Sequence, residues 1–181
     1  GQAEARALAE YFTNIPLQAI YSSPLSRAMG TAQAVAEAKG LRVIPEPDFI
    51  DIDFGEWQGL PLKEVREKYS DLYRLWQERP EAIHFPGGEN LARVRVRAWE
   101  GLQKVLRENP DGNALILSHR VVTKILLCAV LDLENSYFWH IRQDTTAVNC
   151  FEYNRGSFVA SLINDTCHLK FIPANSGKKD F

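Results

Sequence analysis

Polar residues suited to binding an anion follow two short apolar segments of the chain. One segment reads I-Y-S-S-P-L-S-R over residues 20–27, and the other reads L-I-L-S-H-R over residues 115–120. Each pattern predicts a buried strand that leads through polar residues into a helix. Helix N-termini at the carboxyl ends of strands carry free N–H groups and the positive end of the helix dipole, which favour phosphate.

Arg27 and His119 are the charged or titratable side chains at these two junctions. Arg27 near a helix start can grip phosphate oxygens through two parallel hydrogen bonds, although a surface ion pair explains the same residue. His119 ends a buried strand, where a phosphate ligand and a hydrogen-bonded core histidine both remain open. Ser118 can orient the ring of His119 or donate to a phosphate oxygen, and serine is also a common strand-end residue.

A third segment, residues 49–59, carries three acids among aromatic and aliphatic neighbours. They are Asp51, Asp53 and Glu56. A carboxyl group held partly out of water suits general acid catalysis, because burial favours the protonated form. Turn capping or ion pairing explains any single member equally well. No wider ligand set accompanies Asp51 and Asp53, so no metal site is predicted.

Strands that alternate with helices position these residues. The hydrophobic patterns predict helices over 2–12, 27–39, 62–77, 90–106 and 121–131, strands over 17–21, 42–44 and 114–117, and a hairpin over 147–153 and 157–163. This order is typical of an α/β domain with a largely parallel sheet. We expect one domain over residues 1–170, followed by a flexible polar tail over 171–181.

The bulk composition excludes several classes of partner. A formal net charge of -2 gives no basic field that would attract nucleic acid or an anionic membrane. Cys128, Cys150 and Cys167 are odd in number and far apart, so neither a zinc site nor a disulfide framework is indicated. We interpret them as reduced thiols of a cytoplasmic protein, with Cys128 in the core. No apolar run approaches the roughly 18 residues of a membrane span.

Four motifs in order resemble the histidine phosphatase superfamily, whose members are similar to phosphoglycerate mutase. They are S-S-P-L-S-R-A at 22–28, I-D-F-G-E-W-Q-G at 52–59, F-P-G-G-E at 85–89 and L-S-H at 117–119. The closest resemblance is to the small branch of α-ribazole and broad-specificity phosphatases. It implies a three-layer α/β sandwich in which helices flank a mostly parallel central sheet.

The resemblance implies a role for each matched residue. Arg27 would grip the transferred phosphoryl group and His119 would donate to its oxygens, with Ser23 and Ser118 in the same phosphate site. The acid that protonates the leaving alkoxide would be Asp51, where the family has Glu.

Two residues in these motifs leave alternatives open. Because Asp is one methylene shorter than the family's Glu, Glu56 remains a second candidate for the acid and a substrate-binding residue. Arg120 stands where most relatives have Gly. It would contact phosphate or a substrate carboxylate, or it would face solvent.

The largest departure from the family is its nucleophile. The family's mechanism begins with an Arg-His-Gly motif, and this motif is absent from the 181 residues. The histidines are His84, His119, His140 and His168. Gly1 resembles the last residue of a turn that follows the motif in relatives. We therefore expect the nucleophile and the first strand to lie upstream, and the chain alone to be inactive.

The implied activity is a metal-independent phosphomonoesterase that needs no cofactor and acts through a phosphohistidine. Its substrate would be a small phosphorylated metabolite such as α-ribazole phosphate, phosphoserine or a sugar phosphate. Two alternatives are mutase-type phosphoryl transfer and a non-catalytic phosphate-binding or regulatory domain. Phe138 and Trp139 are expected to be exposed. Either a homodimer face or a substrate lid would explain them, and both alternatives remain open.

Overall fold

The structure is a computed structural model that describes residues 1–170 and 172. The tail predicted over 171–181 therefore lies outside the described residues, apart from Ile172. The α-helices are α1 (Gln2–Phe12), α2 (Ser26–Lys39), α3 (Leu62–Lys68), α4 (Ser70–Glu78), α5 (Leu91–Glu108) and α6 (Arg120–Val130). The strands are β1 (Ala19–Ser22), β2 (Val43–Pro45), β3 (Ala114–Leu117), β4 (Val148–Asn154) and β5 (Ser157–Asp165). Short 3₁₀ helices are η1 (Pro47–Phe49), η2 (Gly55–Trp57), η3 (Pro80–Ala82), η4 (Asn135–His140) and η5 (Cys167–Leu169).

Parallel strands form the sheet that positions the predicted anion site. Its order is β2-β1-β3, and β4 and β5 form a separate antiparallel hairpin. Ser22 at the end of β1 pairs with Leu117 at the end of β3. The polar residues that follow these two strands therefore emerge side by side at one edge of the sheet.

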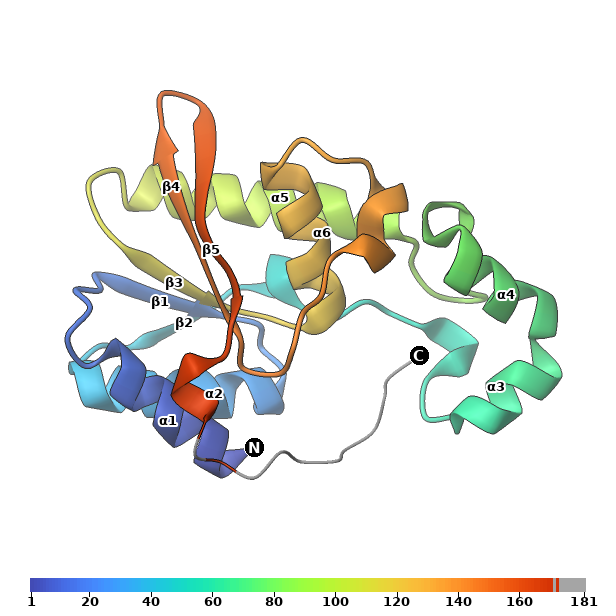
Figure 1. Cartoon of the computed structure of the whole chain (residues 1–181), viewed down its shortest axis with the longest axis horizontal. Coiled ribbons are helices and arrows are strands. Elements are labelled where there is room, and N and C mark those ends of the chain that lie inside the picture. Colours follow the sequence, from blue (N-terminus) through green and yellow to red (C-terminus); the bar gives the residue numbers. More distant parts are fainter. Residues whose placement is uncertain (171, 173–181) are drawn as a thin grey trace.

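Helices cover both faces of this sheet. In Figure 1, α1 and α2 lie on one face, and α5 and α6 lie on the other. One core cluster joins α1 and α2 to β1 and β3 through residues such as Leu8, Val35, Ile20 and Leu117. A second packs α5 and α6 against η2, α3, α4 and η4. The predicted α/β sandwich with a parallel sheet is confirmed.

Two local predictions were wrong. The helix expected over 62–77 is two helices, because Tyr69 leaves helical geometry with φ -126° and ψ 40°. Its ring instead lies 6.0 Å from that of Trp57, and its hydroxyl donates to Glu56. Phe138 is also buried rather than exposed, at 1%. Trp139 is exposed at 39%, but its indole N–H is tied to the carbonyl oxygen of Trp76.

Two further findings concern the cysteines and possible membrane spans. All three cysteines are free thiols, and Cys128 is buried as predicted. Within residues 1–170 and 172, the structure has no helix with both the length and the apolar character needed to cross a membrane.

Candidate active site

The ends of β1 and β3 bring Ser23 and His119 into contact. The ladder between the strands extends one step beyond β1, because the backbone N–H of Ser23 donates to Leu117 O at 2.9 Å. The Ser23 hydroxyl then lies 2.7 Å from Nε2 of His119. Residues 96 positions apart in sequence thus meet where the sequence pattern predicted an anion site.

Arg27 joins this pair from the first turn of α2. Its Nε donates to Nδ1 of His119 at 3.1 Å, and its Nη2 donates to Oδ2 of Asp51 at 2.6 Å. The Arg27 side chain is 60% exposed, so much of its guanidinium surface faces water. An anion arriving from solvent can therefore reach this charge, which fits the predicted role of Arg27.

The contacts of His119 define its tautomer. Because a guanidinium nitrogen can only donate, Nδ1 of His119 accepts and the ring proton is on Nε2, which donates to Ser23 Oγ. Burial lowers the pKa of His119, the Asp51 charge opposes this shift, and the Arg27 charge adds to it. The imidazole is therefore neutral at pH 7, with a donating Nε2–H at the carboxyl edge of the sheet.

Asp51 is the carboxylate that the structure brings to the cluster. Its Oδ2 lies 3.4 Å from His119 Nδ1, and its Oδ1 accepts from the backbone N–H of Ile52 at 3.0 Å. The side chain is 25% exposed. The three side chains Arg27, Asp51 and His119 thus form one connected group, which we call the clamp.

Glu56, the second candidate acid, has a different set of contacts. Its Oε2 accepts a hydrogen bond from the Tyr69 hydroxyl at 2.6 Å. Among the described residues, Glu56 makes no hydrogen bond or ion pair with a member of the clamp. The structure therefore groups Asp51, and not Glu56, with Arg27 and His119.

Ser118 and Arg120 flank His119 in the chain. The Ser118 hydroxyl donates to the carbonyl oxygen of Phe49 at 2.8 Å, so it holds the segment that leads to Asp51. Its contact thus lies with the backbone before the acid and not with the imidazole ring. Arg120 is half-buried as the first residue of α6, and its charge is felt by Lys124 one turn further along the helix.

Arg97 and Glu89 were not predicted as site residues, yet they hold the segment that carries Asp51. Arg97 donates to the carbonyl oxygens of Asp48, Ile50 and Asp51 at 2.8, 2.7 and 3.2 Å. Its other contacts are two hydrogen bonds of 2.9 Å to the carboxylate of Glu89. A charged residue in the apolar stripe of α5, between Val94 and Gly101, is the sequence signal that could have identified Arg97.

The Glu89 carboxylate also binds the backbone of the motif at 52–59. It accepts from the backbone N–H of Asp53 at 3.0 Å as well as from Arg97. Burial alone would raise the pKa of Glu89, but the Arg97 and Asp53 hydrogen bonds lower it overall. The lowered pKa favours the ionised form of Glu89, which holds the Arg97 guanidinium in place beside the backbone of Asp51.

Glycines allow the motifs at 52–59 and 85–89 to pack backbone against backbone. The N–H of Glu56 donates to Pro86 O at 2.9 Å, and the N–H of Glu89 donates to Asp53 O at 2.8 Å. A Cβ on Gly55, which has φ +55°, would overlap Pro86 O, and a Cβ on Gly88 would overlap Asp53 O. The two motifs therefore form one rigid unit behind Asp51.

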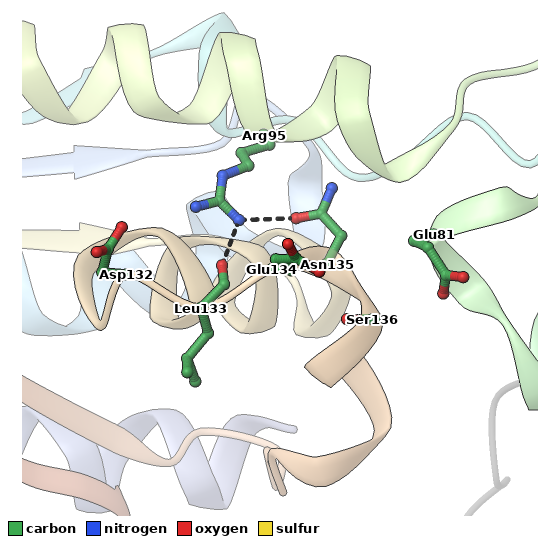
Figure 2. A pocket seen from close by; sticks show the side chains of 7 residues that line it. All are labelled: Glu81, Arg95, Asp132, Leu133, Glu134, Asn135 and Ser136. Carbon is green, nitrogen blue, oxygen red and sulfur yellow. Dashed lines mark hydrogen bonds between the residues drawn. The ribbon is translucent and has the colours of Figure 1, made fainter.

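Surface hollows lie beside other parts of the chain. One, of about 380 Å³, is lined by Glu81, Arg95, Asp132, Leu133, Glu134, Asn135 and Ser136 (Figure 2). There Arg95 donates to Leu133 O and Asn135 Oδ1 at 2.7 and 3.0 Å, which anchors the chain after α6. Another, of about 450 Å³, is lined by Glu89, Asn90, Ala92, Arg93, Val96 and Arg97. Neither includes a clamp residue, and residues 1–170 and 172 hold no group of three or more His, Cys, Asp or Glu suited to a metal.

Comparisons with known proteins agree with this geometry. A family model described as the histidine phosphatase superfamily (branch 1) matches residues 1–166. Phosphoserine phosphatase 1 of Hydrogenobacter thermophilus is 37% identical over 169 residues, which cover 93% of this chain and 80% of that protein.

Two solved structures show the same fold. Bacillus stearothermophilus YhfR superposes with a TM-score of 0.91 and 26% identity, over 94% of this chain and 85% of that one. The α-ribazole phosphatase from Shigella flexneri superposes with a TM-score of 0.81 and 20% identity, over 91% of this chain and 81% of that one.

Proposed function

The chain belongs to the histidine phosphatase superfamily as a phosphatase, and on that premise we propose that it hydrolyses small phosphate monoesters through a phosphohistidine. The histidine would come from a segment that precedes Gly1. The observation that carries this proposal is the clamp, in which Arg27 donates to both His119 and Asp51.

The clamp supplies the charge and the proton that this reaction needs. Arg27 binds two phosphoryl oxygens, and His119 and the N-terminus of α6 stabilise the negative charge of the transition state. The nucleophilic histidine forms an N–P bond as the ester P–O bond breaks, and Asp51 gives its proton to the leaving oxygen. Water then attacks phosphorus, returns a proton to Asp51 and releases inorganic phosphate.

The position of Asp51 fits its role as the acid. Its Oδ2 accepts from Arg27 Nη2 at 2.6 Å, so the carboxyl group lies beside the guanidinium that holds the phosphoryl group.

The free edge of β3 supports an additional strand and hence an upstream nucleophile. Ala114, Leu115 and Ile116 are only half-buried, although a strand in a parallel sheet is normally covered on both faces. Within the described residues β3 is hydrogen-bonded to β1 alone. A strand at the other edge of β3 would end beside His119, where a nucleophile is needed.

The test uses protein that carries an Arg-His-Gly segment ahead of Gly1, with p-nitrophenyl phosphate in EDTA. We expect turnover in EDTA, little or no turnover by the 181-residue chain, and binding of inorganic phosphate by both. Activity that depends on added metal would contradict the proposed mechanism. Full activity of Asp51→Asn together with an inactive Glu56→Gln would identify Glu56, instead of Asp51, as the general acid.

A non-catalytic phosphate-binding domain is the second candidate, because Arg27 and His119 could hold phosphate without a nucleophile. The same experiment separates the two functions. Phosphate binding without turnover in the extended protein would support the binding domain.

The names of the relatives indicate only a broad class of substrate. Phosphoserine, from the relative in Hydrogenobacter thermophilus, carries a carboxylate, whereas α-ribazole phosphate, from the Shigella flexneri structure, is a nucleoside phosphate without one. Both are small monoesters whose leaving group is an alcohol. We propose that the substrate of this chain belongs to the same group of small metabolites.

A further inference from the structure

Lys124 is a buried cation on the helix that follows His119. It lies on α6, one turn beyond Arg120, and is 4% exposed. Its Nζ lies 4.3 Å from the ring centroid of Phe138 and 4.5 Å from that of Trp139. Both aromatic residues belong to η4, which packs against α6.

The charge of Lys124 has no counter-charge in the described part of the chain. No carboxylate there forms an ion pair or hydrogen bond with its Nζ, and the nearest charge that acts on it is the like charge of Arg120. Burial, followed by the Arg120 charge, lowers the pKa of Lys124 to about 8, and only Cys128 acts weakly in the other direction. Aromatic faces stabilise an ammonium group, but they do not neutralise it.

A second donor in this cluster also lacks an acceptor. The ring of Trp76 lies 5.0 Å from both Phe138 and Trp139, and its buried indole N–H has no hydrogen-bond partner among the described residues. The side chains of Lys124, Trp76, Phe138 and Trp139 provide no acceptor of their own. Buried donors normally have partners, so this cluster is short of an acceptor.

The helix α6 links Lys124 to the phosphate site. Long side chains on a helix lean toward its N-terminus, and α6 begins directly after His119, while Nζ of Lys124 lies against the rings of η4. Arg120 lies on the same side of the helix, four residues before Lys124. A ligand that reached from Arg27 and His119 to Lys124 would therefore pass Arg120.

We propose that Lys124 and Arg120 bind a carboxylate of the substrate, which makes the substrate a phosphorylated carboxylic acid such as phosphoserine. This inference rests on the proposed phosphatase function. A carboxylate supplies the acceptor and the negative charge that the cluster lacks. A nucleoside monophosphate ester such as α-ribazole phosphate supplies neither.

The test compares ligands that differ only in this group, on the 181-residue chain by calorimetry. Phosphoserine is paired with phosphoethanolamine, which lacks the carboxylate, and 3-phosphoglycerate is paired with glycerol 1-phosphate. We expect the carboxylate to tighten binding about ten-fold in both pairs. Equal affinities within both pairs, with inorganic phosphate still bound, would overturn the carboxylate site and leave the phosphatase proposal standing.

Variants assign the effect to Lys124. Lys124→Met should remove the preference while inorganic phosphate binds as before, and Lys124→Arg should restore it. Lys63→Met, at an exposed lysine of α3, is the matched control and should keep the full preference. A preference that persists in Lys124→Met would overturn the assignment. Failure of inorganic phosphate to bind the unsubstituted chain would overturn the phosphatase site itself, and the carboxylate site with it.

Discussion

Arg27 donates from Nε to Nδ1 of His119 over 3.1 Å, so this nitrogen carries the lone pair of a neutral imidazole. Burial lowers the pKa of His119, the Asp51 carboxylate 3.4 Å from Nδ1 opposes this shift, and the Arg27 charge adds to it. The stability of the fold therefore depends on the protonation of this one ring.

The first prediction concerns stability at acid pH. The pKa of His119 is below its value of 6.5 in the unfolded chain, so the unfolded state binds more protons as the pH falls through 6.5. The free energy of unfolding should decrease from pH 7 to pH 5, and His119→Gln should show a smaller decrease. Urea denaturation at the two pH values measures this. An equal decrease in variant and unsubstituted chain would contradict it.

Half-buried His168 should add to the same pH dependence. Burial also lowers its pKa, and its ring centroid lies 5.4 Å from that of Tyr11. The variant with both His119→Gln and His168→Gln should therefore be less sensitive to pH than either single variant.

A second prediction concerns the leaving group, in protein that carries the Arg-His-Gly segment. Asp51→Asn should lower turnover of phosphoserine about 10²–10⁴-fold, because the alkoxide then leaves without a proton. Turnover of p-nitrophenyl phosphate should fall much less, since nitrophenolate needs no proton. Glu56→Gln, whose carboxylate contacts Tyr69, is the control and should leave both rates nearly unchanged. Equal losses on the two substrates in Asp51→Asn would argue against general acid catalysis.

Arg97 gives a third prediction. Arg97→Gln loses hydrogen bonds to three carbonyl oxygens and to Glu89, and should cost about 2–4 kcal/mol of stability. It should also lower kcat on alkyl phosphates more than it weakens binding of inorganic phosphate, because it displaces Asp51 and not Arg27. Arg107→Gln, exposed on the same helix, should be neutral in both measurements.

The fourth prediction compares two glycines. Gly88→Ala places a Cβ against the backbone of Asp53 and should destabilise the fold by about 1–3 kcal/mol. Gly30→Ala in α2 meets open space and should be stabilising by about 0.5–1 kcal/mol, as expected inside a helix. Thermal or urea unfolding measures both, and similar effects at the two positions would contradict the close packing of the motifs.

Lys124 provides a fifth prediction, which needs no ligand. At pH 7 the ammonium is protonated in both states, and its burial penalty is fully present in the folded state. Lys124→Met should therefore raise the free energy of unfolding at pH 7, by about 1–3 kcal/mol after loss of the cation–π contacts. The gain should shrink between pH 8 and 10.5, as the folded and then the unfolded lysine lose their protons. A gain that stays constant over this range would show that Lys124 is not desolvated.

The sequence predicted the parts of the site that local pattern controls. A short apolar strand followed by polar residues identified Arg27 and His119 as candidate site residues. This was possible because the residues that end a strand and begin the next helix are adjacent in sequence. Asp51 was different, since its segment forms no strand and only the family resemblance distinguished it from Glu56. The role of Arg97 depends on three carbonyl oxygens nearly 50 positions away, which no local pattern encodes.

Long-range packing also explains the predictions that were wrong. The periodicity of residues 62–77 is helical throughout, but the contacts of Tyr69 with Trp57 and Glu56 interrupt the helix. Phe138 sits in a polar neighbourhood of the sequence, yet Trp76 and Lys124 bury it. In both cases a partner from a distant segment decided the outcome.

The half-exposed apolar strand β3 has a consequence for handling the protein. An unpaired strand edge is a template for another chain, so we expect self-association that rises with concentration. A synthetic peptide that carries an apolar strand followed by Arg-His-Gly would compete for this edge. If the proposed nucleophile lies on such a strand, complementation of this kind would make the 181-residue chain the larger half of a split enzyme, with its activity switched on by the peptide.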